Sequence, residues 1–204
     1  MGTPVERFPL FPLALVLLPH EVVPLHIFEE RYKLMIGECI EDEHEFGIVW
    51  LSDSGLKDVG CSARVTEVVD RLDDGRMNVL VTGARPFRLM RRIDDMPYPA
   101  GDIELLDEDR ASAADVAEEA HARYADLVER VTDDRPDDAD LADLDAYAMA
   151  ATVELEHAIK QDLLELRSER ARLERVATVF RAALQRIDET ERVDEVARSN
   201  GKLR

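Results

Sequence analysis

The segment from Arg7 to Tyr32, RFPLFPLALVLLPHEVVPLHIFEERY, constrains the fold more than any other part of the chain. Its apolar residues come in short runs, and four prolines interrupt them. Proline has no backbone N–H and disrupts a helix interior, so this segment does not suit one long helix. It also lacks the roughly 18 consecutive apolar residues of a membrane helix. We therefore predict short extended segments and turns.

An amphipathic helix is predicted to follow this segment directly. Its apolar residues recur at helical spacing and form a single stripe, with charged residues outside the stripe. The polar sequence of residues 41–44 is expected to end the helix. The stripe consists of Phe28, Tyr32, Met35, Ile36, Cys39 and Ile40.

Strand patterns follow the helix. Residues 46–51 form a compact apolar run, and apolar residues alternate with polar ones over residues 61–66. The alternation fails at residues 67–69, which indicates a β-bulge or a bend. Asp73, Asp74 and Gly75 then predict a hairpin turn, and Met77, Val79 and Val81 share one face of the returning strand.

The remaining strands are expected at residues 85–92 and 103–106, with Gly83 interrupting the returning strand. Strands joined by short turns, with one helix inserted early, favour a small closed or half-closed β-barrel. The predicted class is α+β, because the pattern becomes helical after residue 108.

Several amphipathic helices are predicted in the second half. Ser112 and Ser168 are the expected N-caps of the first and last of them, and a break is expected near Thr152. We predict a barrel subdomain at 5–108, a helical subdomain at 109–190 and a polar tail at 191–204. The expected stripes contain Val116, Ala120, Tyr124, Leu127, Val128 and Val131; Leu141, Leu144, Ala148 and Ala151; Leu155, Ile159, Leu163 and Leu166; and Leu173, Val176, Phe180, Leu184 and Ile187.

The charge distribution argues against nucleic-acid binding. The net charge is −19, and residues 107–145 alone contain 15 acidic and 4 basic residues. Such a field repels phosphate backbones, and solubility is its simplest explanation. Cys39 and Cys61 are isolated, without metal-binding or redox spacing. With no secretion signal at the N-terminus, we expect a cytoplasmic protein without membrane contact.

Catalytic chemistry finds little support in the sequence. His20 and Glu21 begin like a zinc-binding HExxH motif, but Pro24 replaces the second histidine. His26 and Glu29 could act as an acid–base pair, although we favour a structural role at the corner between strand and helix. We expect no metal, no cofactor and no catalytic group.

Two surface hypotheses remain. Arg85, Arg88, Arg91 and Arg92 could contact RNA, but we favour solvated arginines that pair with nearby carboxylates. The candidate peptide-binding residues are Met90, Met96 and Tyr98, because exposed methionine and aromatic groups adapt to varied apolar ligands. The alternative, which we favour, is that these residues fold back over the barrel together with Pro97 and Pro99.

The N-terminal segment resembles the opening of the Lon-protease N-terminal domain, the module that receives polypeptide substrates in that protease. The similar pieces are Phe8–Leu13, Pro19, Leu25–Glu29, Arg31, Tyr32 and Met35, and the resemblance continues over roughly residues 7–187. The resemblance implies a PUA-like β-barrel followed by a helical subdomain. His20 stands where the family commonly has glycine, so we expect a different turn there. The signature residues, expected to be structural, are Phe11, Pro12, Pro19, His26, Phe28, Glu29, Arg31 and Tyr32.

The resemblance also implies a function. The sequence contains no GxxxxGK[ST] phosphate-binding loop and nothing like the serine–lysine segment of Lon, so we expect no enzyme. The leading hypothesis is non-catalytic binding of unfolded or partly folded polypeptide, with delivery to a separate protease or chaperone. The alternatives are an adaptor that docks on one folded partner and, third, an RNA-binding PUA-like domain.

Overall fold

The computed structural model describes residues 2–107 and 113–201, and side chains up to residue 193. By their contacts these residues form two compact units. The first contains residues 2–107 and 150–167, and the second contains residues 113–149 and 168–201. The predicted boundary placed every helix after residue 108 in one subdomain, whereas the contacts group residues 150–167 with the sheet.

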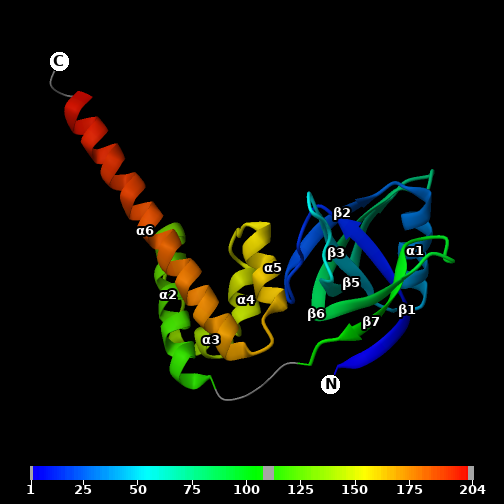
Figure 1. The fold of residues 1–204 in the computed structure, drawn as a ribbon. Helices are drawn as coiled ribbons and strands as arrows, with labels where there is room; N and C mark the ends of the chain where they lie inside the picture. The colour runs from blue at the N-terminus through cyan, green and yellow to red at the C-terminus, as the bar shows by residue number, and fades with distance from the viewer. Residues whose placement is uncertain (1, 108–112, 202–204) are drawn as a thin grey trace. The chain divides into compact units, whose positions relative to one another are not determined.

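The first unit is built on one curved sheet (Figure 1). Hydrogen bonding runs in the order β1-β7-β6-β5-β3, and β3 also pairs with β1 in parallel, so the sheet closes on itself. This confirms the predicted barrel. β2 adds to β6, and β4 adds to β3. The strands are β1 Thr3–Leu13, β2 Val22–Ile27, β3 Phe46–Ser52, β4 Gly55–Leu56, β5 Val59–Arg71, β6 Met77–Ile93 and β7 Ala100–Leu105.

The barrel interior is apolar. The rings of Phe8 and Phe87 meet edge to face with their centroids 5.8 Å apart, which is an arrangement that aromatic pairs prefer. The two rings belong to a cluster of buried apolar side chains from strands that are distant in the sequence, and packing within this cluster stabilises the closed sheet. Its buried members are Phe8, Leu10, Val49, Phe87, Ile103 and Leu105.

Gly83 does not interrupt the returning strand as predicted, because β6 continues through it. Its N–H donates to the carbonyl of Glu21, and its own carbonyl accepts from the N–H of His20, both at 2.9 Å. A Cβ atom at Gly83 would lie 2.0 Å from the carbonyl oxygen of Leu18. Glycine is therefore required at position 83, because the backbone of Leu18 approaches it too closely for any side chain. His20 has φ 68, so it adopts the left-handed conformation that we expected only of glycine.

Helix α1, Glu30–Glu41, packs on the barrel through Tyr32, Met35, Ile36 and Cys39. The predicted stripe was wrong at Phe28, whose side chain is 59% exposed. The reason is local: Glu29 is the N-cap and has extended backbone, so Phe28 precedes the helix. The predicted hairpin turn is confirmed, with Gly75 at φ 82 between β5 and β6.

Helix α5, His157–Glu165, belongs to the same unit as the barrel. The Gln161 side-chain N–H donates to the carbonyl of Val59 at 3.1 Å. The ammonium of Lys160 pairs with the carboxylate of Glu21, and the ring of His157 lies edge to face against Trp50. These contacts attach α5 to the barrel, and α5 also buries Leu163 and Leu164.

The second unit contains α2 Ala114–Thr132, α3 Asp138–Ala142 and α6 Glu169–Gly201, with most of α4 Ala146–Ala151. α2 and α6 lie side by side (Figure 1), and the rings of Tyr124 and Phe180 touch between them. The expected cap Ser168 is confirmed, since its hydroxyl accepts from the Ala171 N–H at 3.2 Å. Ser112 lies outside the described residues.

One helical prediction was wrong. The stripe from Leu141 to Ala151 is divided between α3 and α4, and the buried residues of α4 are Ala146, Tyr147, Met149 and Ala150. Within the predicted polar tail, α6 continues as far as Gly201. Within the described residues, every helix is too short or too polar to cross a membrane.

Candidate functional site

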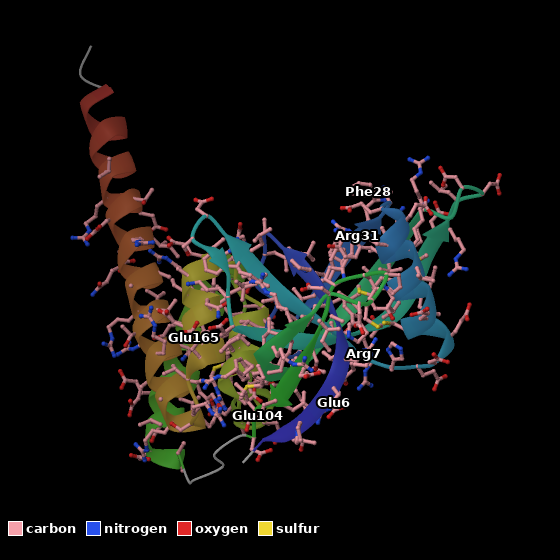
Figure 2. The ribbon with its side chains drawn as sticks, turned by 45° about the vertical axis from the view of Figure 1, so that its right-hand side comes forward. Glu6, Arg7, Phe28, Arg31, Glu104 and Glu165 are labelled. Carbon is pink, nitrogen blue, oxygen red and sulfur yellow. The ribbon has the colours of Figure 1, made fainter. Side chains whose placement is uncertain are left out.

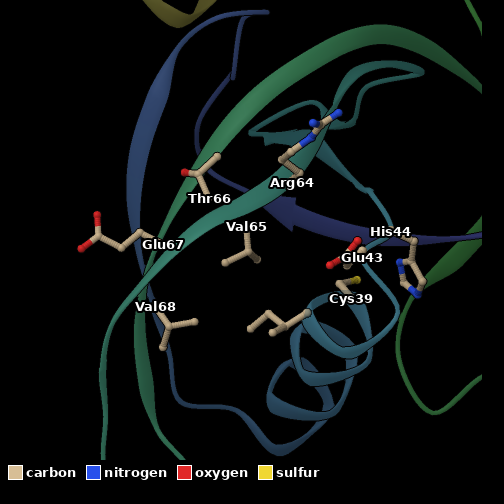
Figure 3. Close-up of a pocket in the computed structure, with 9 residues that line it drawn as sticks. Cys39, Glu43, His44, Arg64, Val65, Thr66, Glu67 and Val68 are labelled. Atoms are coloured by element: carbon tan, nitrogen blue, oxygen red, sulfur yellow. The ribbon is translucent and has the colours of Figure 1, made fainter.

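A pocket of about 500 Å³ lies between the C-terminal half of α1 and the middle of β5 (Figure 3). Cys39 is buried and Ile40 half-buried on the helix side, and two valines come from the strand side. A space of this size lies in the range of pockets that bury a small ligand or a side chain. The lining residues are Cys39, Ile40, Glu43, His44, Arg64, Val65, Thr66, Glu67 and Val68.

The irregularity of β5 creates the apolar wall of the pocket. Val65 lies opposite Val81, and Val68 lies opposite Val79, with register shifts on either side of residues 67–68. Under strict alternation Val65 and Glu67 would share a face, but the bulge puts Val68 there instead. Figure 3 shows Val65 and Val68 pointing into the pocket and Glu67 pointing away. The predicted bulge is thus confirmed, and it re-aims a side chain.

Glu43 lies at the mouth of the pocket, just beyond the C-terminal end of α1. Its φ is 53, which places a non-glycine residue in the left-handed region. The His44 N–H donates to the carbonyl of Cys39 at 3.2 Å, which is the hydrogen bond of a Schellman helix end. Glu43 occupies the position that most such helix ends give to glycine.

The cationic side chain of the lining is already paired. Arg64 lies 3.2 Å from a carboxylate oxygen of Glu45, and Arg85 lies 3.8 Å from the other one. The pocket therefore combines an apolar floor, formed by Val65 and Val68, with a carboxylate at its mouth, that of Glu43, which is unpaired among the described residues.

The predicted peptide-binding residues do not form one exposed surface. Tyr98 is buried, and its hydroxyl donates to Glu38 of α1 at 2.5 Å, so its ring cannot be offered to a ligand. Burial, followed by this hydrogen bond, raises the pKa of Tyr98 well above its usual range. Met96 is half-buried, with its sulfur 2.9 Å from the Arg7 guanidinium. Met90 is 61% exposed on β6.

Most signature residues pack or form ion pairs near the junction between the barrel and α1. The rings of Phe11 and Tyr32 contact each other at a tilt of 31°, with centroids 4.1 Å apart. Arg31 lies over the Tyr32 ring and pairs with Glu29 at 2.7 Å. Pro19 is buried and Pro12 half-buried.

The other two signature residues lie on the surface. His26 is exposed and hydrogen-bonds Asn78 at 2.7 Å rather than Glu29. Its ring stacks on Phe28, which lies beside the first turn of α1 with Arg31 (Figure 2). Phe28 was expected to have a structural role as a signature residue, but its side chain is not buried.

The arginine run on β6 is partly neutralised. Arg91 pairs with Asp102 at 2.6 Å, and Arg85 faces Glu45, as the solvated alternative predicted. Arg88 and Arg92 are exposed. In the part of the chain that the structure describes, histidine, cysteine and carboxylate side chains form no group that could hold a metal ion.

The α1–β5 pocket was missed at the sequence level. Its signals were present, namely the failed alternation after Val65 and an acidic residue where helices commonly end in glycine. Neither signal states which face Val68 takes, because that depends on pairing with Val79.

The closed barrel, the helix packed on it and the pocket between them define a small α+β domain with a surface pocket. The sequence profile of the substrate-binding domain of ATP-dependent protease La (Lon) matches residues 7–180. The chain therefore belongs to the Lon substrate-binding domain family.

Individual relatives agree with this membership. The chain is 28% identical to Lon protease 2 of Herpetosiphon aurantiacus over 194 residues, which cover 85% of this chain and 23% of that protein. It thus spans about a quarter of that relative. A Lon N-terminal domain protein from Xanthomonas campestris has the same fold, with a TM-score of 0.62, 24% identity and coverage of 85% of this chain and 98% of that one.

The N-terminal domain of the Lon protease of Mycobacterium avium complex is similar to the same degree. Its TM-score is 0.62 at 22% identity, and the match covers 86% of this chain and 97% of that one. These likenesses support the fold, including the barrel and the helices that follow it.

Proposed function

We propose that this domain binds segments of unfolded polypeptide without altering them chemically, and that the α1–β5 pocket receives an apolar side chain. The observation that carries the proposal is the apolar wall formed by Val65 and Val68 opposite Ile40. Membership in a substrate-binding family supports it.

The size of the pocket implies weak, adaptable binding. Burial of one leucine or phenylalanine side chain contributes about 1.5–3 kcal/mol, and 4.1 kcal/mol corresponds to a Kd of only about 1 mM. A client must therefore engage further exposed apolar residues, such as Val22 or Phe28, at the same time. Such binding suits many clients rather than one.

The corresponding role is to pass clients to a separate protease or chaperone in the cytoplasm. An adaptor for a single folded protein is the alternative, and it would yield one stoichiometric partner on co-purification. RNA binding is not favoured, because Arg85 and Arg91 face carboxylates.

Fluorescence anisotropy with a permanently unfolded protein and with its folded form tests the proposal. We expect binding of the unfolded form alone. Val68→Asp should weaken it at least several-fold, whereas Val69→Asp, on the same strand and 56% exposed, is the matched control outside the pocket. Met90→Ser tests the surface predicted from the sequence. Equal binding by Val68→Asp and the unchanged protein would count against the pocket.

A further inference from the structure

We propose that the α1–β5 pocket selects polypeptide segments in which a large apolar side chain has a lysine or arginine within two residues, and that Glu43 receives the cation. This inference rests on the proposed function, since it specifies which segments the same pocket accepts.

Glu43 combines two features that oppose local stability. Its φ of 53 is a conformation that glycine adopts without steric cost. Its carboxylate also lies at the negative end of the α1 dipole, where a basic residue would be favourable. Glu41 and Asp42 precede it, and the last turn of α1 contains no basic residue. Residues that break local rules in this way are concentrated at functional sites.

The charges around the pocket leave Glu43 available. Arg64 is engaged by Glu45, and no hydrogen bond or ion pair within the described residues involves the Glu43 carboxylate. Glu43 is exposed, so a ligand can reach it.

The shape of the site favours a polypeptide segment as the occupant. An apolar side chain can rest on the lining residues Val65, Val68 and Ile40 while a neighbouring residue remains beside Glu43. Residues in an extended chain are about 3.3–3.4 Å apart, so a cation one or two positions away reaches the mouth. Only a segment with both an apolar side chain and a cationic one can bury the first against the valines and pair the second with the Glu43 carboxylate.

Three labelled peptides of one length, each with a central leucine flanked by lysine, glutamine or glutamate, provide the test in fluorescence anisotropy. We expect the lysine peptide to bind about three- to fivefold more tightly than the glutamine peptide, and the glutamate peptide most weakly. The differences should shrink in about 0.5 M salt, because salt screens exposed charges.

Variants assign the effect to one carboxylate. Glu43→Gln should reduce the lysine peptide to the affinity of the glutamine peptide and leave the glutamine peptide unchanged. Glu67→Gln is the matched control, because Glu67 lines the same pocket but points away from it (Figure 3). Glu43→Gly should raise the urea midpoint of unfolding while abolishing the lysine preference, which separates recognition from folding.

Equal binding of all three peptides would overturn the inference and leave the proposed function standing. Absence of binding by every peptide and by the unfolded protein would overturn both. Self-association in sedimentation analysis that Val68→Asp abolishes would assign the pocket to a second copy, and would likewise overturn the inference.

Discussion

The ammonium of Lys160 in α5 pairs with the carboxylate of Glu21, which lies 139 positions earlier, in the turn before β2. The two side chains are only 12% and 13% exposed. Glu21 also accepts the N–H of Leu18 at 2.9 Å, so one carboxylate fixes its own turn and attaches a distant helix. An ion pair this shielded loses more when broken than a surface pair does.

Lys160→Met is expected to lower the free energy of unfolding by about 2 kcal/mol, between the values typical of surface and buried pairs. The charge of Glu21 would remain shielded without its partner. Urea denaturation measures the loss, and Arg76→Met, which breaks a half-exposed pair with Asp74, serves as the control with a clearly smaller expected loss. The double variant Lys160→Met/Glu21→Gln should lose less than the sum of the single changes. Additive losses would show that the two groups are not coupled.

Glu169 is expected to be critical in the second unit. One of its oxygens accepts the Ala146 N–H at 2.7 Å, and the other accepts from Arg172, whose side chain is 2% exposed and lies over the Tyr147 ring. Glu169→Ala should cost about 3 kcal/mol, because it removes a partner from a buried charge and from a helix N-terminus. Urea denaturation again provides the measurement.

The neighbouring Arg170 provides the control for this change. Its pair with Asp115 is exposed, at 42% and 67% for the two side chains, so Arg170→Ala should cost clearly less than Glu169→Ala. Similar losses for Glu169→Ala and Arg170→Ala would contradict the importance of burial.

What the sequence predicted well depends on neighbours in the chain. The turn at Gly75, the cap at Ser168 and the bulge after Val65 follow from local backbone and side-chain preferences. The N-terminal segment also indicated the barrel, through its family resemblance.

The remaining features depend on distant residues. Tyr98 is buried, and its hydroxyl donates to Glu38, which lies 60 positions away in the sequence. The parallel pairing of β1 with β3, which places Leu10 opposite Gly47, closes the barrel. The apolar periodicity of the sequence does not predict which strands pair. The pocket was missed for the same reason, since the face that Val68 occupies is set by Val79 on another strand.

Two glycines should respond to alanine in opposite directions. Gly83→Ala should lower the free energy of unfolding by at least about 2 kcal/mol, because its Cβ would lie 2.0 Å from the Leu18 carbonyl oxygen and backbone would have to move. Gly37→Ala in α1 meets nothing within 4 Å and should stabilise by about 0.5–1 kcal/mol. Thermal or urea unfolding of both variants checks this. Stabilisation by Gly83→Ala would refute the close approach of the turn to β6.

Alkaline pH should destabilise the protein through its buried thiols. Burial, followed by the charge of Glu38, raises the pKa of Cys39 to about 12, and burial also raises the pKa of Cys61 well above its usual range. The unfolded chain releases thiol protons above about pH 8.5, whereas the folded chain retains them. The stabilising contribution is therefore complete below pH 8.5 and is lost as the pH rises towards 12.

Cys39→Ala isolates this contribution. Between pH 7 and pH 10 the free energy of unfolding, measured with urea in the presence of a reductant, should fall by about 2 kcal/mol less in the variant than in the unchanged protein. The small cavity left by the substitution lowers stability at both pH values and so cancels in the comparison. Parallel pH dependences for the two proteins would mean that the Cys39 thiol ionises alike in the folded and unfolded chains, contrary to its burial against the sheet.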